Sequence, residues 1–166
     1  LICEVNEAIL EKISTKDNPQ RVIGVYKQIW NTIDIVTGGV WVALDQVRDP
    51  GNLGTIIRTI DAVGARGVIL IDHCCDPYSP MTSAEFQHFA RTLWNGDIIG
   101  TILQTDKNAQ EQDYKANSIL LMGNEQAGIS DELRATCTTL VKLPMRGRAD
   151  SLNLSIATGV MLYEMV

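Results

Sequence analysis

The chain has 166 residues, of which 45% are hydrophobic and 20% are charged, and its formal net charge at pH 7 is −6. This composition is typical of a globular protein and excludes intrinsic disorder, and the length suits one domain with a sizeable core or one domain with an appendage. No run approaches the roughly 18 unbroken apolar residues that a membrane span needs, and the opening residues lack the positive charge of a signal peptide. The acidic balance argues against a generic polyanion-binding protein.

The cysteines favour a reducing, cytoplasmic environment, because they form no C-x-x-C pair and no disulfide-rich spacing. A metal site at Cys74 and Cys75, beside His73 and Asp76, is the alternative interpretation. No second pair of ligands lies at a spacing typical of zinc, so we expect no metal. The four cysteines are Cys3, Cys74, Cys75 and Cys137.

Residues 1–30 are expected to be an N-terminal remnant or linker that joins a catalytic domain over residues 31–166. A helix is predicted around residues 4–13, followed by a turn at 18–20. The apolar run at 22–25 is either a first strand of the domain or the tail of an upstream module. Because the sequence opens without a methionine, we expect it to be a piece of a longer chain.

From residue 40 onward, short β-branched runs alternate with helical patterns. This alternation of continuously apolar strands and helices predicts an α/β fold with a parallel sheet and helices on both of its faces. Ser83, Ser130 and Ser151 are candidate N-caps of the last three helices. Strands are predicted at 40–44, 67–71, 97–102, 118–122 and 139–143, and helices at 53–63, 83–94, 130–136 and 151–165.

The last predicted helix carries two apolar stripes, and a helix that is apolar on two sides is buried on two sides. One side covers its own sheet, and the other needs a partner, most simply a second copy of the chain. The alternative is that the helix is buried wholly within one larger domain. One stripe is Leu152, Ile156, Val160 and Tyr163, and the other is Leu154, Ala157, Met161 and Met165.

Three predicted strands run into unusual polar turns, within residues 44–58, 121–130 and 143–155. Each turn has a structural explanation by itself, because glycines permit tight turns and Asn or Ser side chains cap helices. Together they favour a functional site, because ligands of open parallel sheets bind beyond the carboxyl ends of the strands. No dinucleotide-binding or P-loop motif is present. His73 and His88 lie outside the turns, which argues against a Ser-His-Asp triad.

The residues of these turns form three motifs in a fixed order. The motifs are Asn52-Leu-Gly-x-x-x-Arg58, Gly123-Asn-Glu125-x-x-Gly128-x-Ser130, and Leu143-Pro-Met145-x-Gly147 running into Ser151-Leu-Asn153-x-Ser155. With the ending Leu162-Tyr163-Glu164, they resemble the motifs of SpoU-type (TrmH-like) RNA 2′-O-ribose methyltransferases of the SPOUT class, over about residues 5–166. The resemblance implies a deep C-terminal trefoil knot, bound S-adenosylmethionine, a homodimer, and methyl transfer to a ribose 2′-hydroxyl of rRNA or tRNA.

The resemblance also implies roles for individual residues. Arg58 stands where the family has its candidate base, but a guanidinium is not normally deprotonated in proteins. We therefore expect Arg58 to grip a phosphate and to stabilise a developing alkoxide, with Asn52 and Glu125 orienting it. The implied catalytic set is Arg58, Asn52, Glu125, Ser151 and Asn153, and the implied cofactor-binding set is Gly123, Leu143, Met145, Ser151 and Leu152.

The chain departs from the family after residues 76–80, where relatives continue with a basic helix and another strand. Here Thr82 begins the next helical pattern almost at once. The segment is either deleted or omitted from this sequence, and we favour omission because the sheet would otherwise lose an element. The small RNA-binding domain that often precedes the family's catalytic domain is also absent or reduced to residues 1–30.

Two alternative functions stay open. One is an antibiotic-resistance rRNA methyltransferase, which differs only in its target nucleotide. The other is a non-catalytic RNA-binding or assembly factor on the same scaffold, against which the presence of Asn52, Arg58, Glu125 and Asn153 argues.

Overall fold

The structure is a computed structural model, and it describes residues 3–14, 22–25, 27, 32–75 and 80–166. The chain divides into two compact units, Leu1–Thr32 and Ile33–Val166. In the first unit, helix α1 (Glu7–Ile13) begins after Asn6, whose side chain accepts a hydrogen bond from the Ile9 amide. Residues 22–25 form no strand, and the turn predicted at 18–20 lies outside the described residues. That residues 1–30 are a remnant or linker stays a prediction.

The second unit is built on a five-stranded sheet in the order β2-β1-β4-β3-β5, and all four strand pairs are parallel. The central strands β1 and β4 are buried along their whole length, which explains their continuous apolar sequences. The strands are β1 (Val40–Asp45), β2 (Gly67–Ile71), β3 (Asp97–Thr101), β4 (Ser118–Met122) and β5 (Thr139–Val141).

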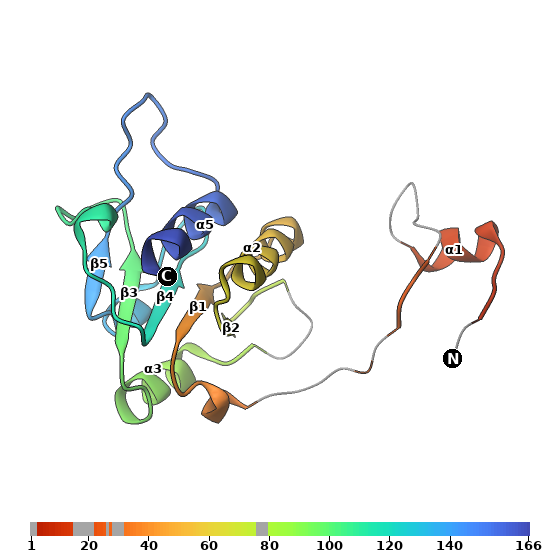
Figure 1. Cartoon of the computed structure of the whole chain (residues 1–166), viewed down its shortest axis with the longest axis horizontal. Helices are drawn as coiled ribbons and strands as arrows, with labels where there is room; N and C mark the ends of the chain where they lie inside the picture. Colours follow the sequence, from red (N-terminus) through yellow and green to blue (C-terminus); the bar gives the residue numbers. More distant parts are fainter. Residues whose placement is uncertain (1–2, 15–21, 26, 28–31, 76–79) are drawn as a thin grey trace. The chain divides into compact units, whose positions relative to one another are not determined.

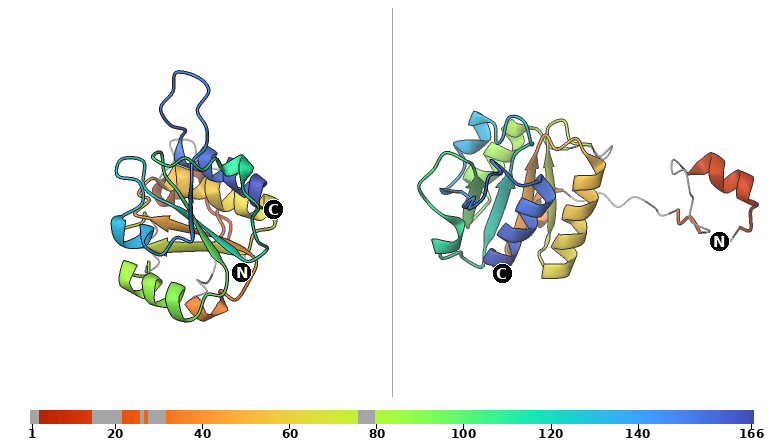
Figure 2. Two further views of the ribbon diagram at one scale, coloured as in Figure 1. Left: turned by 90° about the vertical axis from the view of Figure 1, so that its left-hand side faces the viewer. Right: turned by 90° about the horizontal axis from the view of Figure 1, so that it is seen from above.

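Helices cover both faces of this sheet, as Figures 1 and 2 show. Side chains alternate across a strand, so Val42 and Leu44 of β1 pack into a core with α2 and α5. Trp41 and Ala43 pack into a second core with α3 and α4 on the opposite face. The helices are α2 (Pro50–Val63), α3 (Ser83–Thr92), α4 (Asp131–Arg134) and α5 (Leu154–Met165). The predicted α/β fold is therefore confirmed.

The predicted N-cap of α3 is wrong by one residue. Thr82 caps the helix: its side chain accepts from the Glu85 amide, and the Glu85 carboxylate accepts from the Thr82 amide. This reciprocal pair is a capping box, which the Thr-x-x-Glu spacing favours over a serine one residue later. The Ser83 amide and hydroxyl instead donate to the carboxylate of Asp72.

Of the other two predicted caps, Ser130 is confirmed as the N-cap residue of α4, although its side chain makes no capping hydrogen bond, and Ser151 is wrong. The last helix begins at Leu154 rather than Ser151, because the Asn153 side chain accepts from the amides of Ser155 and Ile156. The structure also contains two short 3-10 helices, η1 (Ile33–Ile35) and η2 (Ala109–Glu111), which the apolar patterns do not predict.

The two stripes of α5 have different environments. Leu154, Met161 and Met165 are at most 6% exposed and belong to the core under α5. The other stripe faces outward, and we call it the α5 strip. It consists of Leu152, Ile156, Val160 and Tyr163, which are 37–68% exposed.

The chain leaves the sheet after β5 and runs through a long loop to α5 (Figure 1). The predicted trefoil knot depends on the path of this segment and stays a prediction. Whether a segment has been lost between β2 and α3 depends on residues 76–79, which lie outside the described residues. Within the described ranges, no helix is long and apolar enough to cross a membrane.

Candidate functional site

The first turn of the candidate site joins β1 to α2. Asp49 caps α2 by accepting a 2.6 Å hydrogen bond from the Gly51 amide, and Pro50 occupies the first helical position. Both residue types favour a helix start at this point. Asn52 therefore lies in the first turn of α2, where its side chain is 6% exposed and directed toward the carboxyl ends of the strands.

The second turn follows β4, and its own side chains hold its shape. The Asn124 side chain accepts from the amides of Gln126 and Ala127, at 2.9 and 2.7 Å. Gly128 adopts a left-handed conformation, with φ 70°, and its amide donates to the Asn124 carbonyl. This conformation favours glycine.

Gly123, at the start of the same turn, is packed against backbone. A Cβ added at this position would collide with the backbone of Gly128 and Ile129. We infer that any side chain at Gly123 would open the turn itself, before it could occupy space that a ligand needs.

A cluster of three side chains joins this turn to the other two. The Asn52 side-chain amide donates to Glu125 Oε1 at 2.8 Å. The Asn153 amide donates to Asn52 Oδ1 at 3.0 Å and to Glu125 Oε1 at 3.4 Å. The structure thus brings together three of the five predicted catalytic residues, which are separated by up to 101 positions in the sequence.

These contacts, with those that Asn153 makes at the start of α5, use the full hydrogen-bonding capacity of the Asn153 side chain and half of that of Asn52. The Asn153 Oδ1 atom accepts hydrogen bonds from the backbone amide and the hydroxyl of Ser155. Asn153 therefore both caps α5 and belongs to the cluster. Glu125 Oε2 accepts no hydrogen bond from the described residues. Because a carboxylate oxygen accepts readily, this atom is available to a hydroxyl group of a ligand.

A large cleft of about 740 Å³ lies beside the cluster, and its volume is within the usual range for ligand pockets. Three segments line it: residues 101–104 after β3, residues 122–129 after β4, and residues 151–154 before α5. Gly123, Ser151 and Leu152 of the predicted cofactor set lie in these segments. Glu125 and Asn153 of the cluster line the same cleft.

An apolar recess of about 100 Å³ continues the large cleft and contains the rest of the predicted cofactor set, Leu143 and Met145. The two cavities share Thr101, Leu103 and Leu152 among their lining residues. All five residues predicted to bind the cofactor therefore line the large cleft or the recess beside it.

Arg58 lies apart from this assembly. It is exposed on α2, six residues and therefore about 9 Å along the helix axis beyond Asn52. In the described part of the chain, no hydrogen bond of Asn52 or Glu125 involves Arg58, so the structure does not bear out the expectation that these residues orient it. The predicted role of Arg58 itself stays a prediction.

Sequence reasoning missed Asp45, the last residue of β1. Its carboxylate is 1% exposed, and Oδ2 accepts a 2.7 Å hydrogen bond from the Ser130 amide, which ties the second turn to β1. Asp45 Oδ1 and Ser130 Oγ are buried without a hydrogen-bond partner among the described residues. The sequence feature that could have identified Asp45 is an acidic residue at the end of an otherwise apolar strand.

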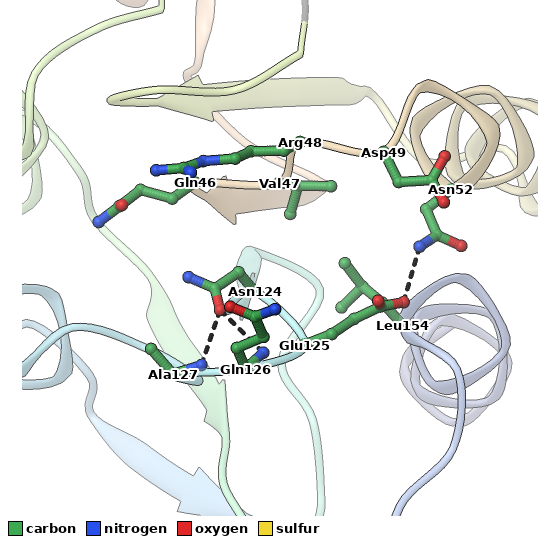
Figure 3. Close-up of a pocket in the computed structure, with 10 residues that line it drawn as sticks. All are labelled: Gln46, Val47, Arg48, Asp49, Asn52, Asn124, Glu125, Gln126, Ala127 and Leu154. Atoms are coloured by element: carbon green, nitrogen blue, oxygen red, sulfur yellow. Dashed lines mark hydrogen bonds between the residues drawn. The ribbon is translucent and has the colours of Figure 1, made fainter.

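Residues 101–104 and a smaller pocket were also missed. The turn after β3 lines the cleft. It contains no glycine or proline that would mark it as a turn in the sequence, so only its position at the end of a strand could have identified it. The smaller pocket, of about 310 Å³, also borders the second turn (Figure 3), and we call it the side pocket. Its lining is Gln46, Val47, Arg48, Asp49, Asn52, Asn124, Glu125, Gln126, Ala127 and Leu154.

The cysteines do not form part of this site. Burial raises the pKa of the Cys74 thiol, whose Sγ contacts the carbonyls of Leu44 and Ile71. Burial also raises the pKa of Cys137 to about 12. Both thiols are therefore protonated at neutral pH and poor metal ligands. No group of three His, Cys, Asp or Glu side chains in the described ranges could hold a metal ion.

Comparisons with known proteins agree with this geometry. A model of the SpoU rRNA Methylase family matches residues 39–92 and 81–163. The crystal structure of an S-adenosylmethionine-bound rRNA methyltransferase from Sinorhizobium meliloti is similar, with a TM-score of 0.86 and 40% identity over 96% of this chain and 69% of that one. The SpoU methyltransferase AviRb from Streptomyces viridochromogenes, also crystallised with this cofactor, gives a TM-score of 0.84 at 28% identity, covering 98% of this chain and 71% of that one.

Two curated relatives have similar sequences. A 23S rRNA uridine 2′-O-methyltransferase of Streptomyces viridochromogenes is 30% identical over 96% of this chain. A 23S rRNA guanosine 2′-O-methyltransferase of Pseudomonas aeruginosa is 34% identical over 75% of it. The chain spans 64% and 57% of the lengths of these relatives. Because the family model matches most of the chain, we conclude that the protein belongs to the SpoU rRNA methylase family.

Proposed function

We propose that the protein is an S-adenosylmethionine-dependent RNA methyltransferase that methylates a ribose 2′-hydroxyl of rRNA or tRNA in the cytoplasm. The observation that carries the proposal is the Asn52–Glu125–Asn153 cluster at the border of the large cleft. The names of the two curated relatives, both 23S rRNA 2′-O-methyltransferases, support the reaction class and the substrate.

The large cleft and its recess fit the methyl donor. Leu143, Met145 and Leu152 supply apolar surface for an adenine ring, and the turn that begins at Gly123 offers backbone groups for hydrogen bonds. The close approach of the Gly123 and Gly128 backbones keeps this turn compact. The five residues that we propose to hold the donor are Gly123, Leu143, Met145, Ser151 and Leu152.

The cluster is positioned to hold the acceptor. When bound, S-adenosylmethionine would supply the methyl group: its C–S bond would break as the C–O bond forms, the neutral thioether would leave, and the hydroxyl proton would pass to water. Glu125 Oε2 is available to accept a hydrogen bond from the 2′-hydroxyl and so to orient its oxygen. Asn52 and Asn153 fix the carboxylate through Oε1. Most of the acceleration of such an in-line displacement comes from positioning.

The proposed function is tested by incubating the protein with labelled S-adenosylmethionine and with rRNA and tRNA from cells that lack the gene. We expect labelled 2′-O-methyl nucleotides in one of the two RNAs, and calorimetry should show that the protein binds the donor. Gly123→Val should abolish binding because it opens the turn, whereas Gly147→Val, in a position where a Cβ meets nothing within 4 Å, should retain it. Tight RNA binding with no methyl transfer would instead support the non-catalytic RNA-binding or assembly factor.

For Arg58, we propose that its exposed guanidinium binds the acceptor RNA and stabilises the developing alkoxide. Arg58→Ala should reduce single-turnover methylation about 10²- to 10³-fold, because a positioned charge on a developing anion has effects of this size, while donor affinity stays near that of the wild type. Arg58→Lys should restore little, because lysine keeps the charge but lacks the planar fork. Near-normal rates for both variants would remove Arg58 from the mechanism.

We also propose a homodimer that buries the α5 strip, and we propose that residues 1–30 are a remnant or linker next to the catalytic domain. The strip gives the dimer its support, because three apolar side chains on α5 and Leu152 just before it are 37–68% exposed, and exposed apolar patches commonly mark interfaces.

Sedimentation at micromolar concentration tests the dimer. Val160→Asp should shift the protein toward monomer because it places a charge in the strip. Leu93→Asp, at a 61% exposed apolar residue on the C-cap of α3, should stay dimeric. Met161→Asp should unfold the protein, because Met161 is fully buried. A monomeric wild type would contradict the proposal.

A further inference from the structure

The side pocket and the large cleft both border the second turn. Residues 124–127 and Leu154 line both cavities. Asn52 lines the side pocket, Asn153 lines the large cleft, and Glu125 lines both. The hydrogen-bonded cluster therefore lies where the two cavities meet.

The side pocket has two polar ends. Figure 3 shows the side chains of Gln46 and Arg48 extending in the same direction, away from Asn52 and Glu125. Gln46 has a left-handed backbone conformation, with φ 54°, and its backbone amide donates a hydrogen bond to the Ile71 carbonyl at 3.2 Å. A non-glycine residue rarely adopts this conformation, and such residues concentrate at functional sites.

Among the charged side chains that line the side pocket, one cation is available to bind an anionic ligand. Asp49 accepts from the Gly51 amide, and Glu125 Oε1 accepts from two asparagines. Arg48 is exposed, forms no ion pair or side-chain hydrogen bond with the described residues, and is the sole cation among the ten residues of this lining. A guanidinium pairs with a phosphate through two parallel hydrogen bonds.

We propose that the side pocket binds the acceptor nucleotide of the RNA, with its ribose at the Asn52–Glu125–Asn153 end and a phosphate on the guanidinium of Arg48. This inference rests on the proposed function. It places the ribose at the cluster, which borders the cleft proposed for the donor, so that the 2′-hydroxyl and the methyl group meet there. Because the chain carries a net charge of −6, its general attraction for RNA is weak, and a single positioned cation has a correspondingly large influence on the register of the RNA.

The test compares Arg48→Ala with Arg91→Ala, a matched control because Arg91 is exposed in the last turn of α3, which packs in the core on the opposite face of the sheet. The full-length proteins are titrated with rRNA from cells lacking the gene, at several salt concentrations. We expect Arg48→Ala to bind this RNA at least about tenfold more weakly, the loss typical of a charge-assisted hydrogen bond. The slope of log K against log salt should fall by about 0.7 to 0.9, for one phosphate contact.

Kinetics complete the test. Arg48→Ala should raise the KM for RNA and leave both kcat and the affinity for S-adenosylmethionine near wild type. Arg48→Lys should recover part of the lost RNA affinity. Arg91→Ala should leave the KM, kcat and donor affinity unchanged. Unchanged RNA affinity and salt slope in Arg48→Ala, with an active wild type, would overturn this inference alone. Methylation of a neighbouring nucleotide by Arg48→Ala, together with weaker RNA binding, would also support the inference, because a phosphate contact fixes the register of the RNA. A wild type that binds RNA through Arg48 but transfers no methyl group would overturn the proposed function and leave the pocket assigned to RNA.

Discussion

One carboxylate oxygen, Oε1 of Glu125, holds the site together. It accepts hydrogen bonds from Asn52, in the turn after β1, and from Asn153, at the start of α5. The parallel register makes this possible, because Ala43 of β1 lies level with Leu121 of β4, and the turns that follow both strands emerge at the same edge of the sheet. If β1 and β4 ran antiparallel, the turns that follow them would lie at opposite ends of the strands.

The same region depends on backbone packing that a side chain would disrupt. Gly123 lies against the backbone of Gly128 and Ile129, and Asp45 accepts a hydrogen bond from the amide of Ser130 just beyond them. Three sets of contacts thus fix the second turn. Asp45 of β1 holds it at Ser130, the Asn124 side chain holds the residues that follow it, and Glu125 ties it to the cluster. A turn that borders both proposed ligand sites has to be rigid if the groups held beside it are to react in a fixed geometry.

The sequence predicted the parallel sheet correctly because β1 and β4 are apolar at every position except Asp45 and Ser118 at their ends, which requires burial on both faces. Its motifs also marked Asn52, Glu125 and Asn153, which the structure brings together. It failed at two helix starts, where several polar residues compete: Thr82 and Asn153 cap α3 and α5, not Ser83 and Ser151. It could not reveal the side pocket, because that pocket depends on how turns far apart in sequence pack together.

The central claim is that Asn52, Glu125 and Asn153 act as one unit, and a double-mutant cycle on methyl transfer tests it most directly. Single-turnover rates with saturating donor would be measured for Asn52→Ala, Asn153→Ala and the double variant, with urea unfolding to verify that each is folded. Residues that act as a unit have strongly non-additive effects, so the double variant should be hardly slower than the slower single variant. Independent effects that multiply in the double variant would contradict the account.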